Sequence, residues 1–149
     1  MSNTKQAVKV EGLRETLRAC NKLGRDANRE LRNAARDIAT ATAREARAEG
    51  MGMSALQRLA ASSVRSGSDR VPKILSGGGA RVGHKRTPVG SIFFGAEFGG
   101  GAKVTTRQFP RHRGQAGYFL WPTIRKRKNR DLALYQRALD RVCERWARE

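Results

Sequence analysis

The sequence predicts a single domain of mixed α+β type that spans all 149 residues. Two observations predict helices: apolar residues recur every three or four positions in the alanine-rich stretch before residue 50, and again after residue 131. A third predicts strands and loops, because residues 51–130 combine glycine, proline and short apolar runs. The 38% hydrophobic content indicates a thin core, rich in alanine and leucine.

Residues 12–50 are expected to be helical. Before them, "VKVEG" at positions 8–12 alternates apolar and polar residues like a short strand, and a first helix follows from Leu13 to Gly24. A longer helix begins near Asp26, which is expected to cap it, and ends in "EGMG". Its apolar side consists of Ala27, Leu31, Ala34, Ala35, Ile38, Ala41 and Ala46. Its other side, either a solvated face or the lining of an interface, carries Arg29, Arg32, Arg36, Arg44 and Arg47.

Residues 51–130 are expected to form basic loops and strands. The segment "SALQRLAASSV" fits either a short helix from Ser54 or a strand, and "SSVRSGSDRVPKILS" mixes strand-like alternation with turn signals. Glycine and proline at residues 76–90 predict a mobile loop or a hairpin tip, after which "VGSIFFGAEF" is apolar. Pro110 and Pro122 argue against a helix in the segment that contains them.

A C-terminal helix is predicted over residues 131–148, with Asp131 in its first turn, where a negative charge favours the helix dipole. Steps of three and four residues produce a narrow apolar seam, which packs on the core of the domain or takes part in a contact between subunits. The seam consists of Leu132, Tyr135, Leu139, Val142 and Trp146.

The positive charge is concentrated in the middle of the chain. The formal net charge is +18, of which residues 1–50 contribute +4, residues 51–130 contribute +14 and residues 131–149 contribute none. Such a field attracts phosphate or an acidic protein surface, and the run "RKRKN" is either a phosphate-contacting patch or a soluble entry to a helix. The residues expected to meet an anionic partner are Arg81, Lys85, Arg86, Arg111, Arg113, Arg125, Lys126, Arg127 and Lys128.

The residue types do not indicate an enzyme, and no catalytic, cofactor-binding or metal-binding residue is predicted. Cys20 and Cys143 are expected to be buried free thiols in a reducing compartment, with a disulfide between them as the alternative. A ribonuclease that uses His84 and His112 is a possible alternative, which requires both rings to converge on one phosphate. The chain has no apolar run long enough to span a membrane, and "MSNTKQAVKV" lacks the apolar region of a secretion signal.

Taken in chain order, three segments resemble the tail-completion (neck) proteins of long-tailed bacteriophages. "VEGLRETLRACNKLGRDANRELRNAARDIATATAREARA" is similar to the family's opening, in which a Gly-Leu start leads into a helix and then a long alanine-rich helix. "FFGAEFGG" resembles its aromatic–Glu–Phe–Gly signature, and "YFLWPTIRKRKNRDLALYQRALDRV" its closing aromatic–Pro segment and terminal helix. Residues 52–86 match least, and "FPRHRGQAGYFLWP" is similar to versions from phages of actinobacteria.

The resemblance implies a structural protein of the virion, an α+β domain with helices packed on a small antiparallel sheet. Copies are expected to form a ring, sixfold by this resemblance, with a head-closure or connector protein on one side and the tail terminator or tail tube on the other. Genomic DNA passes through the channel, and neither catalysis nor a cofactor is implied. The alternatives are the tail terminator of the same neck and a non-viral basic nucleic-acid-binding module.

The resemblance also nominates residues for interfaces and for structure: Phe94, Glu97, Phe98, Gly99, Tyr118, Trp121 and Pro122. Phe94 and Phe98 are expected to anchor the core, and the glycines to permit a close turn. Glu97 is expected to pair with an arginine of the same chain or of the next subunit. The alternative is an ordinary surface glutamate.

Overall fold

A computed structural model describes residues 15, 18, 22, 24–101 and 108–148. The strand expected at residues 8–12 lies outside the described residues, as does nearly all of the first expected helix. No helix in the described part of the chain is long and apolar enough to cross a membrane.

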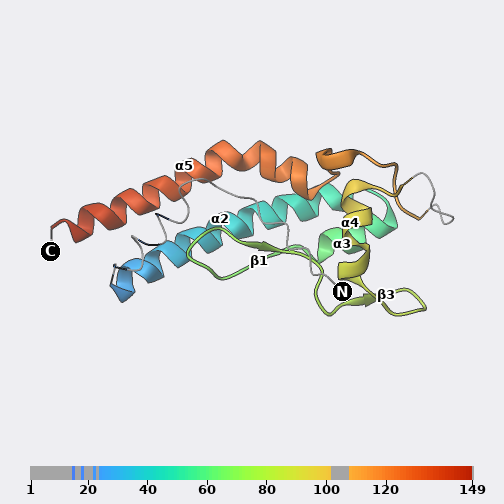
Figure 1. The fold of residues 1–149 in the computed structure, drawn as a ribbon, viewed down its shortest axis with the longest axis horizontal. Coiled ribbons are helices and arrows are strands. Elements are labelled where there is room, and N and C mark those ends of the chain that lie inside the picture. Colours follow the sequence, from blue (N-terminus) through green and yellow to red (C-terminus); the bar gives the residue numbers. More distant parts are fainter. Residues whose placement is uncertain (1–14, 16–17, 19–21, 23, 102–107, 149) are drawn as a thin grey trace.

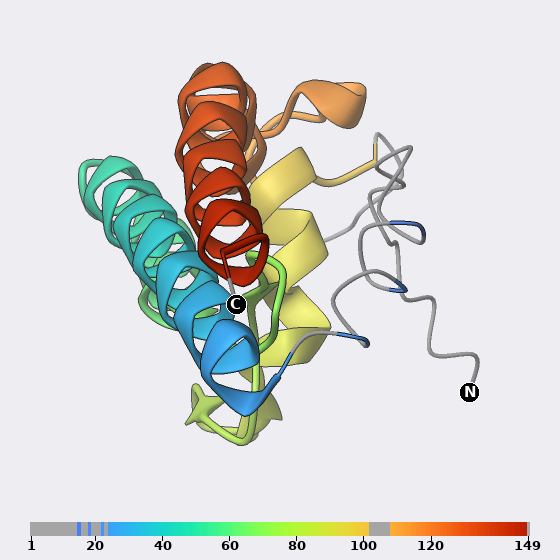
Figure 2. The ribbon, with the colours of Figure 1, turned by 90° about the vertical axis from the view of Figure 1, so that its left-hand side faces the viewer.

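Two long antiparallel helices form the body of the molecule (Figure 1). They are α2 (Arg25–Met51) and α5 (Leu120–Trp146), each of 27 residues, and they lie side by side along their length (Figures 1 and 2). Leu31 of α2 packs with Ala138 and Val142 of α5, and Ala35 and Ile38 pack with Tyr135. Small alanine side chains let the two backbones approach closely, and most of the predicted apolar side is confirmed, although Ala41 is half-buried and Ala39 and Ala43 are buried as well.

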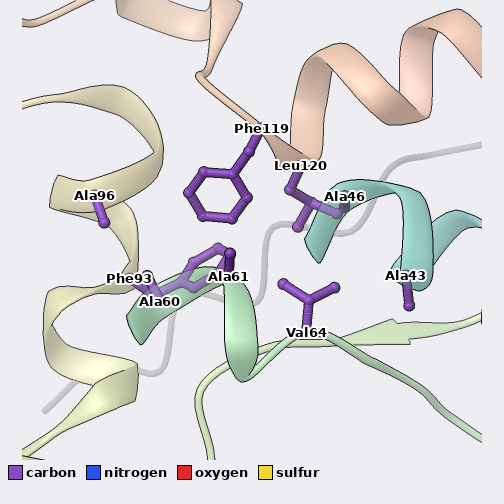
Figure 3. Packing of buried hydrophobic residues seen from close by; sticks show 9 residues of the cluster. All are labelled: Ala43, Ala46, Ala60, Ala61, Val64, Phe93, Ala96, Phe119 and Leu120. Carbon is purple, nitrogen blue, oxygen red and sulfur yellow. The ribbon is translucent and has the colours of Figure 1, made fainter. Parts of the chain in front are cut away.

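Two short helices cover one end of this pair. Ser54 and Gln57 form a reciprocal capping box that starts α3 (Ala55–Ser62), so the open choice at this segment is settled in favour of a helix. The second helix is α4 (Val89–Phe98). Together with the adjoining ends of α2 and α5 they enclose the main core (Figure 3), whose residues are Ala43, Ala46, Ala60, Ala61, Val64, Phe93, Ala96, Phe119 and Leu120.

The strands are short and form two separate antiparallel pairs. β1 (Arg65–Ser66) pairs with β2 (Ile74–Leu75), and β3 (Arg81–Val82) pairs with β4 (Thr87–Pro88). The second pair is a hairpin with Gly83 and Arg86 at positive φ in its turn, as the glycine-rich segment predicted. The α+β class is therefore confirmed, although the main core lies between helices and neither strand pair extends into a larger sheet.

The prediction that residues 51–130 are loops and strands is wrong in two places, because this region contains α4 and the start of α5; the helix α3 is one of the two alternatives predicted for its segment. α5 begins at Leu120 rather than at residue 131, so Asp131 lies in its interior. The argument from Pro122 failed because Pro122 is the third residue of the helix, where no intrahelical partner for its nitrogen is needed.

Details of the two long helices also differ from expectation. Gly24 is the N-cap of α2, while Asp26 lies in the first turn and forms an ion pair with Arg29 at 3.0 Å. The predicted end is confirmed, because α2 finishes at Met51. In the seam of α5, Tyr135 and Val142 are buried and Leu139 is half-buried, but Leu132 and Trp146 are exposed, and Trp146 lines a small pocket with the start of α2.

Candidate interaction surfaces

Glu97 is the most unusual polar residue of the fold, since its side chain is fully buried in the last turn of α4. Its carboxylate accepts four backbone hydrogen bonds from the start of α5. Oε1 accepts from the amides of Tyr118 (3.2 Å) and Trp121 (2.8 Å), and Oε2 from those of Phe119 (3.2 Å) and Leu120 (3.0 Å). The expected pairing with an arginine is therefore wrong, as is the alternative of a surface glutamate.

This carboxylate substitutes for the missing cap of α5. The N-cap residue, Phe119, makes no side-chain cap, so the first amides of the helix need acceptors from elsewhere. Glu97 supplies them, its charge lies at the positive end of the helix dipole, and Pro122 has no N–H to satisfy. Gly117 makes room: its φ is +72°, and a Cβ there would lie 2.3 Å from Glu97 Oε1.

The glycine after the Glu–Phe pair permits a close turn, as expected. Gly99 has φ +86°, and a Cβ there would lie 2.3 Å from the carbonyl oxygen of Arg111. The neighbouring amide of Gly100 donates to the carbonyl of Pro110 at 2.9 Å, and that of Arg113 donates to the carbonyl of Phe98 at 2.9 Å. Segment 108–113 is thereby held against the end of α4.

Phe93 rather than Phe94 anchors the core, which corrects the prediction. Phe93 is 2% exposed and packs edge-on against Phe119, whereas Phe94 is 52% exposed. Phe98 is half-buried; its ring stacks on Phe94 at a centroid distance of 6.2 Å and meets Trp121 at 5.3 Å. The three rings form an aromatic ladder, Phe94–Phe98–Trp121, that runs from the surface to the base of α5.

Tyr118 and Pro122 complete this region. The Tyr118 hydroxyl donates to the carbonyl of Arg111 at 2.6 Å, and the guanidinium of Arg113 lies 4.2 Å above the Tyr118 ring. Pro122 is half-buried in the first turn of α5. These two residues therefore hold local structure around the Glu97 cap.

The residues expected to meet an anionic partner do not form one patch. Arg81, Lys85 and Arg86 are exposed on the β3–β4 hairpin. Arg111 and Arg113 are exposed beside η1 (Gly114–Ala116), on the opposite side of the molecule from that hairpin (Figures 1 and 2). The remaining four belong to α5, where Arg125 donates to the carbonyls of Gln115 and Ala116, and Lys128 is exposed. Positive charge thus surrounds this end of the molecule.

Arg127 is not available to a partner, which corrects its assignment. It is 9% exposed and lies between the two long helices. Its guanidinium binds Glu45 at 2.8 Å and Asp131 at 3.1 Å, and its Nε donates to the Thr42 hydroxyl at 3.1 Å. Lys126 pairs with the same glutamate at 3.0 Å. A run of four basic residues on a helix must point in several directions, and one of them points inward.

We call this cluster the clasp; it consists of Thr42, Glu45, Lys126, Arg127 and Asp131. Its contacts shift the pKa values of Glu45 and Arg127. Hydrogen bonds from Arg127, and then from Lys126, lower the pKa of the Glu45 carboxyl. The same bond to Glu45 raises the pKa of Arg127, against the effect of its burial. Glu45 and Arg127 therefore stay charged at neutral pH, and their ion pair ties α2 to α5.

The arginine side of α2 lines a shallow groove of about 630 Å³ together with the segment that connects β1 to β2. Five of its lining residues are arginines and three are small polar residues: Arg25, Asn28, Arg29, Arg32, Asn33, Arg36, Ser68 and Arg70. Arg47, expected on this side, instead donates to the carbonyl of Val64 at 2.8 Å. The spacing of the arginines indicated one face, but the contribution of Arg70 could not be read from it.

The histidines and the exposed cysteine do not support the chemistry considered for them. The β3–β4 turn, which contains His84, and the segment beside η1, which contains His112, lie on opposite sides of the fold (Figures 1 and 2), so the backbone does not bring the two histidines together. Cys143 is exposed, contrary to the prediction of a buried thiol, because its side of α5 faces away from α2. Within the described residues, no group of three potential metal ligands occurs.

Comparisons with known proteins add no relative: no protein-family model, curated protein or solved structure matches the chain.

Proposed function

We propose that the chain is a structural protein of the virion neck in a long-tailed phage. In this role its copies form a sixfold tail-completion ring between the head-closure or connector protein and the tail terminator or tube, around the genomic DNA. It is assembled in the host cytoplasm and performs no catalysis.

The observation that carries this proposal is the contact between the two most distinctive segments of the resemblance. The Glu–Phe–Gly segment supplies Glu97, and the aromatic–Pro segment supplies the amides of residues 118–121 that its carboxylate binds. Two separate likenesses to the phage family thus belong to one buried unit, in which Gly99, Gly117 and Pro122 each have a steric or hydrogen-bonding reason to be present. A coincidental likeness in either segment alone would not require this.

The exposed surface fits a protein that neighbours cover. Phe94 at the end of the aromatic ladder is 52% exposed, Leu132 on α5 is 46% exposed and Trp146 is 55% exposed. Singly exposed apolar residues are common on any protein surface, so the contiguous Phe94–Phe98–Trp121 ladder is the feature that supports a contact site. A charge of +18 on every copy opposes a bare ring, so we expect assembly to require salt or an anionic partner.

The test is the assembly state of the purified protein. Sedimentation velocity and negative-stain electron microscopy are carried out at low salt, at high salt and with a polyanion added at low salt. We expect monomers in the first condition and closed rings of one size in at least one of the others. Phe94→Ser removes the exposed end of the aromatic ladder and is expected to weaken the rings, while the protein stays folded with a small fall in melting temperature. Monomers under all three conditions would refute the proposal, and rings at low salt would refute the repulsion argument.

A further inference from the structure

The arginine groove on α2, defined by the eight residues given above, has the composition of a phosphate-binding surface. No lining residue is acidic and none is apolar. Arg25, Arg29, Arg32 and Arg36 follow at steps of four, three and four residues, which keeps them on one face of the helix. Arg70 reaches the groove from the β1–β2 segment, so the site is built from two parts of the fold.

The carboxylates of α2 leave this surface positive. Glu30 pairs with Arg145 of α5 at 2.9 Å, and Glu45 belongs to the clasp, so both face the other long helix. Asp26 pairs with Arg29 at the groove's edge, but both side chains are largely exposed, and such a pair exchanges readily with an outside anion. Asp37 of α2 is exposed and is not a lining residue, so the lining itself carries only positive and neutral side chains.

We propose that this groove binds the phosphate backbone of double-stranded DNA. The arginine row on α2 runs from Arg25 to Arg36, which is eleven helical steps or about 16 Å. Over that length one strand of a duplex presents about five phosphates, at about 3.4 Å each, against the four arginines of the row. This inference goes beyond the neck function and does not depend on ring formation, because one copy carries the whole groove.

The lining distinguishes a duplex backbone from other anionic partners. Protein interfaces centre on apolar and aromatic side chains, and the groove has none. Single-stranded nucleic acid is held by stacking on aromatic rings, which are also absent from the lining. Arginine, asparagine and serine are residue types that contact phosphate oxygens without reading bases, so binding is expected to be independent of sequence.

The experiment compares two double variants of equal charge in the full-length protein. Arg32→Gln/Arg36→Gln removes two groove arginines, and Arg130→Gln/Arg137→Gln removes two exposed arginines of α5 outside the groove. Binding to a fluorescent DNA duplex is measured by anisotropy between about 50 and 200 mM salt. Circular dichroism and melting temperature verify that each variant is folded, and Arg32→Lys/Arg36→Lys tests whether charge alone restores binding.

We expect the groove variant to lose at least about tenfold in affinity and its salt slope to fall by about 1.8, which corresponds to two phosphate contacts. The α5 variant should lose less than about threefold and keep its slope, and the lysine variant should recover most of the affinity. Equal losses in the two glutamine variants would refute a groove, because net charge alone would then explain binding. Binding of polyglutamate or single-stranded DNA as tight as that of the duplex would also overturn the proposal.

Discussion

Glu97→Gln tests the buried cap of α5 by changing one atom and keeping the size of the side chain. The glutamine oxygen can accept from only one pair of amides, either Tyr118 and Trp121 or Phe119 and Leu120. Its NH₂ group then faces the other pair, donor against donor. Two hydrogen bonds are lost, and two buried N–H groups are left without an acceptor.

The structure sets the size of the effect. A hydrogen bond to a charged group contributes about 1.5–3 kcal/mol, so the loss of two lowers the free energy of unfolding by about 3–6 kcal/mol. For a domain of this length, each kcal/mol corresponds to about 2–4 °C, which gives a fall in melting temperature of about 6–24 °C. Because native domains are stable by only about 5–15 kcal/mol, the variant is expected to be markedly weakened.

Thermal and urea unfolding, followed by far-UV circular dichroism, measure this change. The matched control is Glu144→Gln, since Glu144 is an exposed glutamate on α5; it should change stability by less than about 0.5 kcal/mol. Glu97→Asp keeps the charge but shortens the side chain, so its stability should lie between those of Glu97→Gln and the natural protein. A Glu97→Gln variant that unfolds together with the control would refute the capping role.

Three further measurements test other parts of the structure. Gly117→Ala places a methyl group against Glu97 at positive φ and should cost about 2–4 kcal/mol in urea unfolding, whereas Gly79→Ala, in open space, should cost less than about 1 kcal/mol. Because the pKa of Glu45 is lowered, its contribution to the free energy of unfolding is fully present above pH 4.5, the ordinary value, and is lost as the pH falls through the lowered pKa. Glu45→Gln should therefore reduce the fall in stability with decreasing pH on the acid side, measured by urea unfolding. An unchanged pH dependence would exclude Glu45 as its source. Cys143 should react rapidly with a thiol reagent in folded Cys20→Ser protein, and slow reaction would contradict its exposure.

The long helices could be predicted because each has one apolar side and one charged side. Residues such as Leu31, Ala35 and Ile38 recur at helical spacing, and that periodicity survives in the packing of α2 against α5. α4 has no such pattern: Phe93 and Ala96 face the core while Phe94 and Phe98 continue apolar character around the outer side. A short segment that is apolar all round does not distinguish helix from strand by periodicity.

The role of Glu97 could not be predicted, because its partners are backbone amides more than twenty positions away in the chain. Every residue except proline has a backbone N–H group, so a sequence does not show which of these groups donate to a carboxylate. An arginine is visible in the sequence, and because arginine is abundant here, the prediction paired Glu97 with an arginine. The clasp could not be predicted for the same reason. Arg127 is one of four consecutive basic residues, and only the packing of α5 on α2 places it opposite Glu45. Only the tertiary arrangement separates these roles.

The way the fold uses its carboxylates is the reason we expect an anionic partner. The chain has 31 Lys and Arg against 13 Asp and Glu, so complete internal pairing would still leave a surplus of 18. Glu97 increases the surplus available to partners, because its charge is used on helix amides rather than on a side-chain cation. Glu30 and Glu45 are directed toward α5, which leaves the arginine side of α2 without carboxylates in its groove. Since like charges at this density repel, the cationic faces are most stable when phosphate or acidic surface from another molecule covers them.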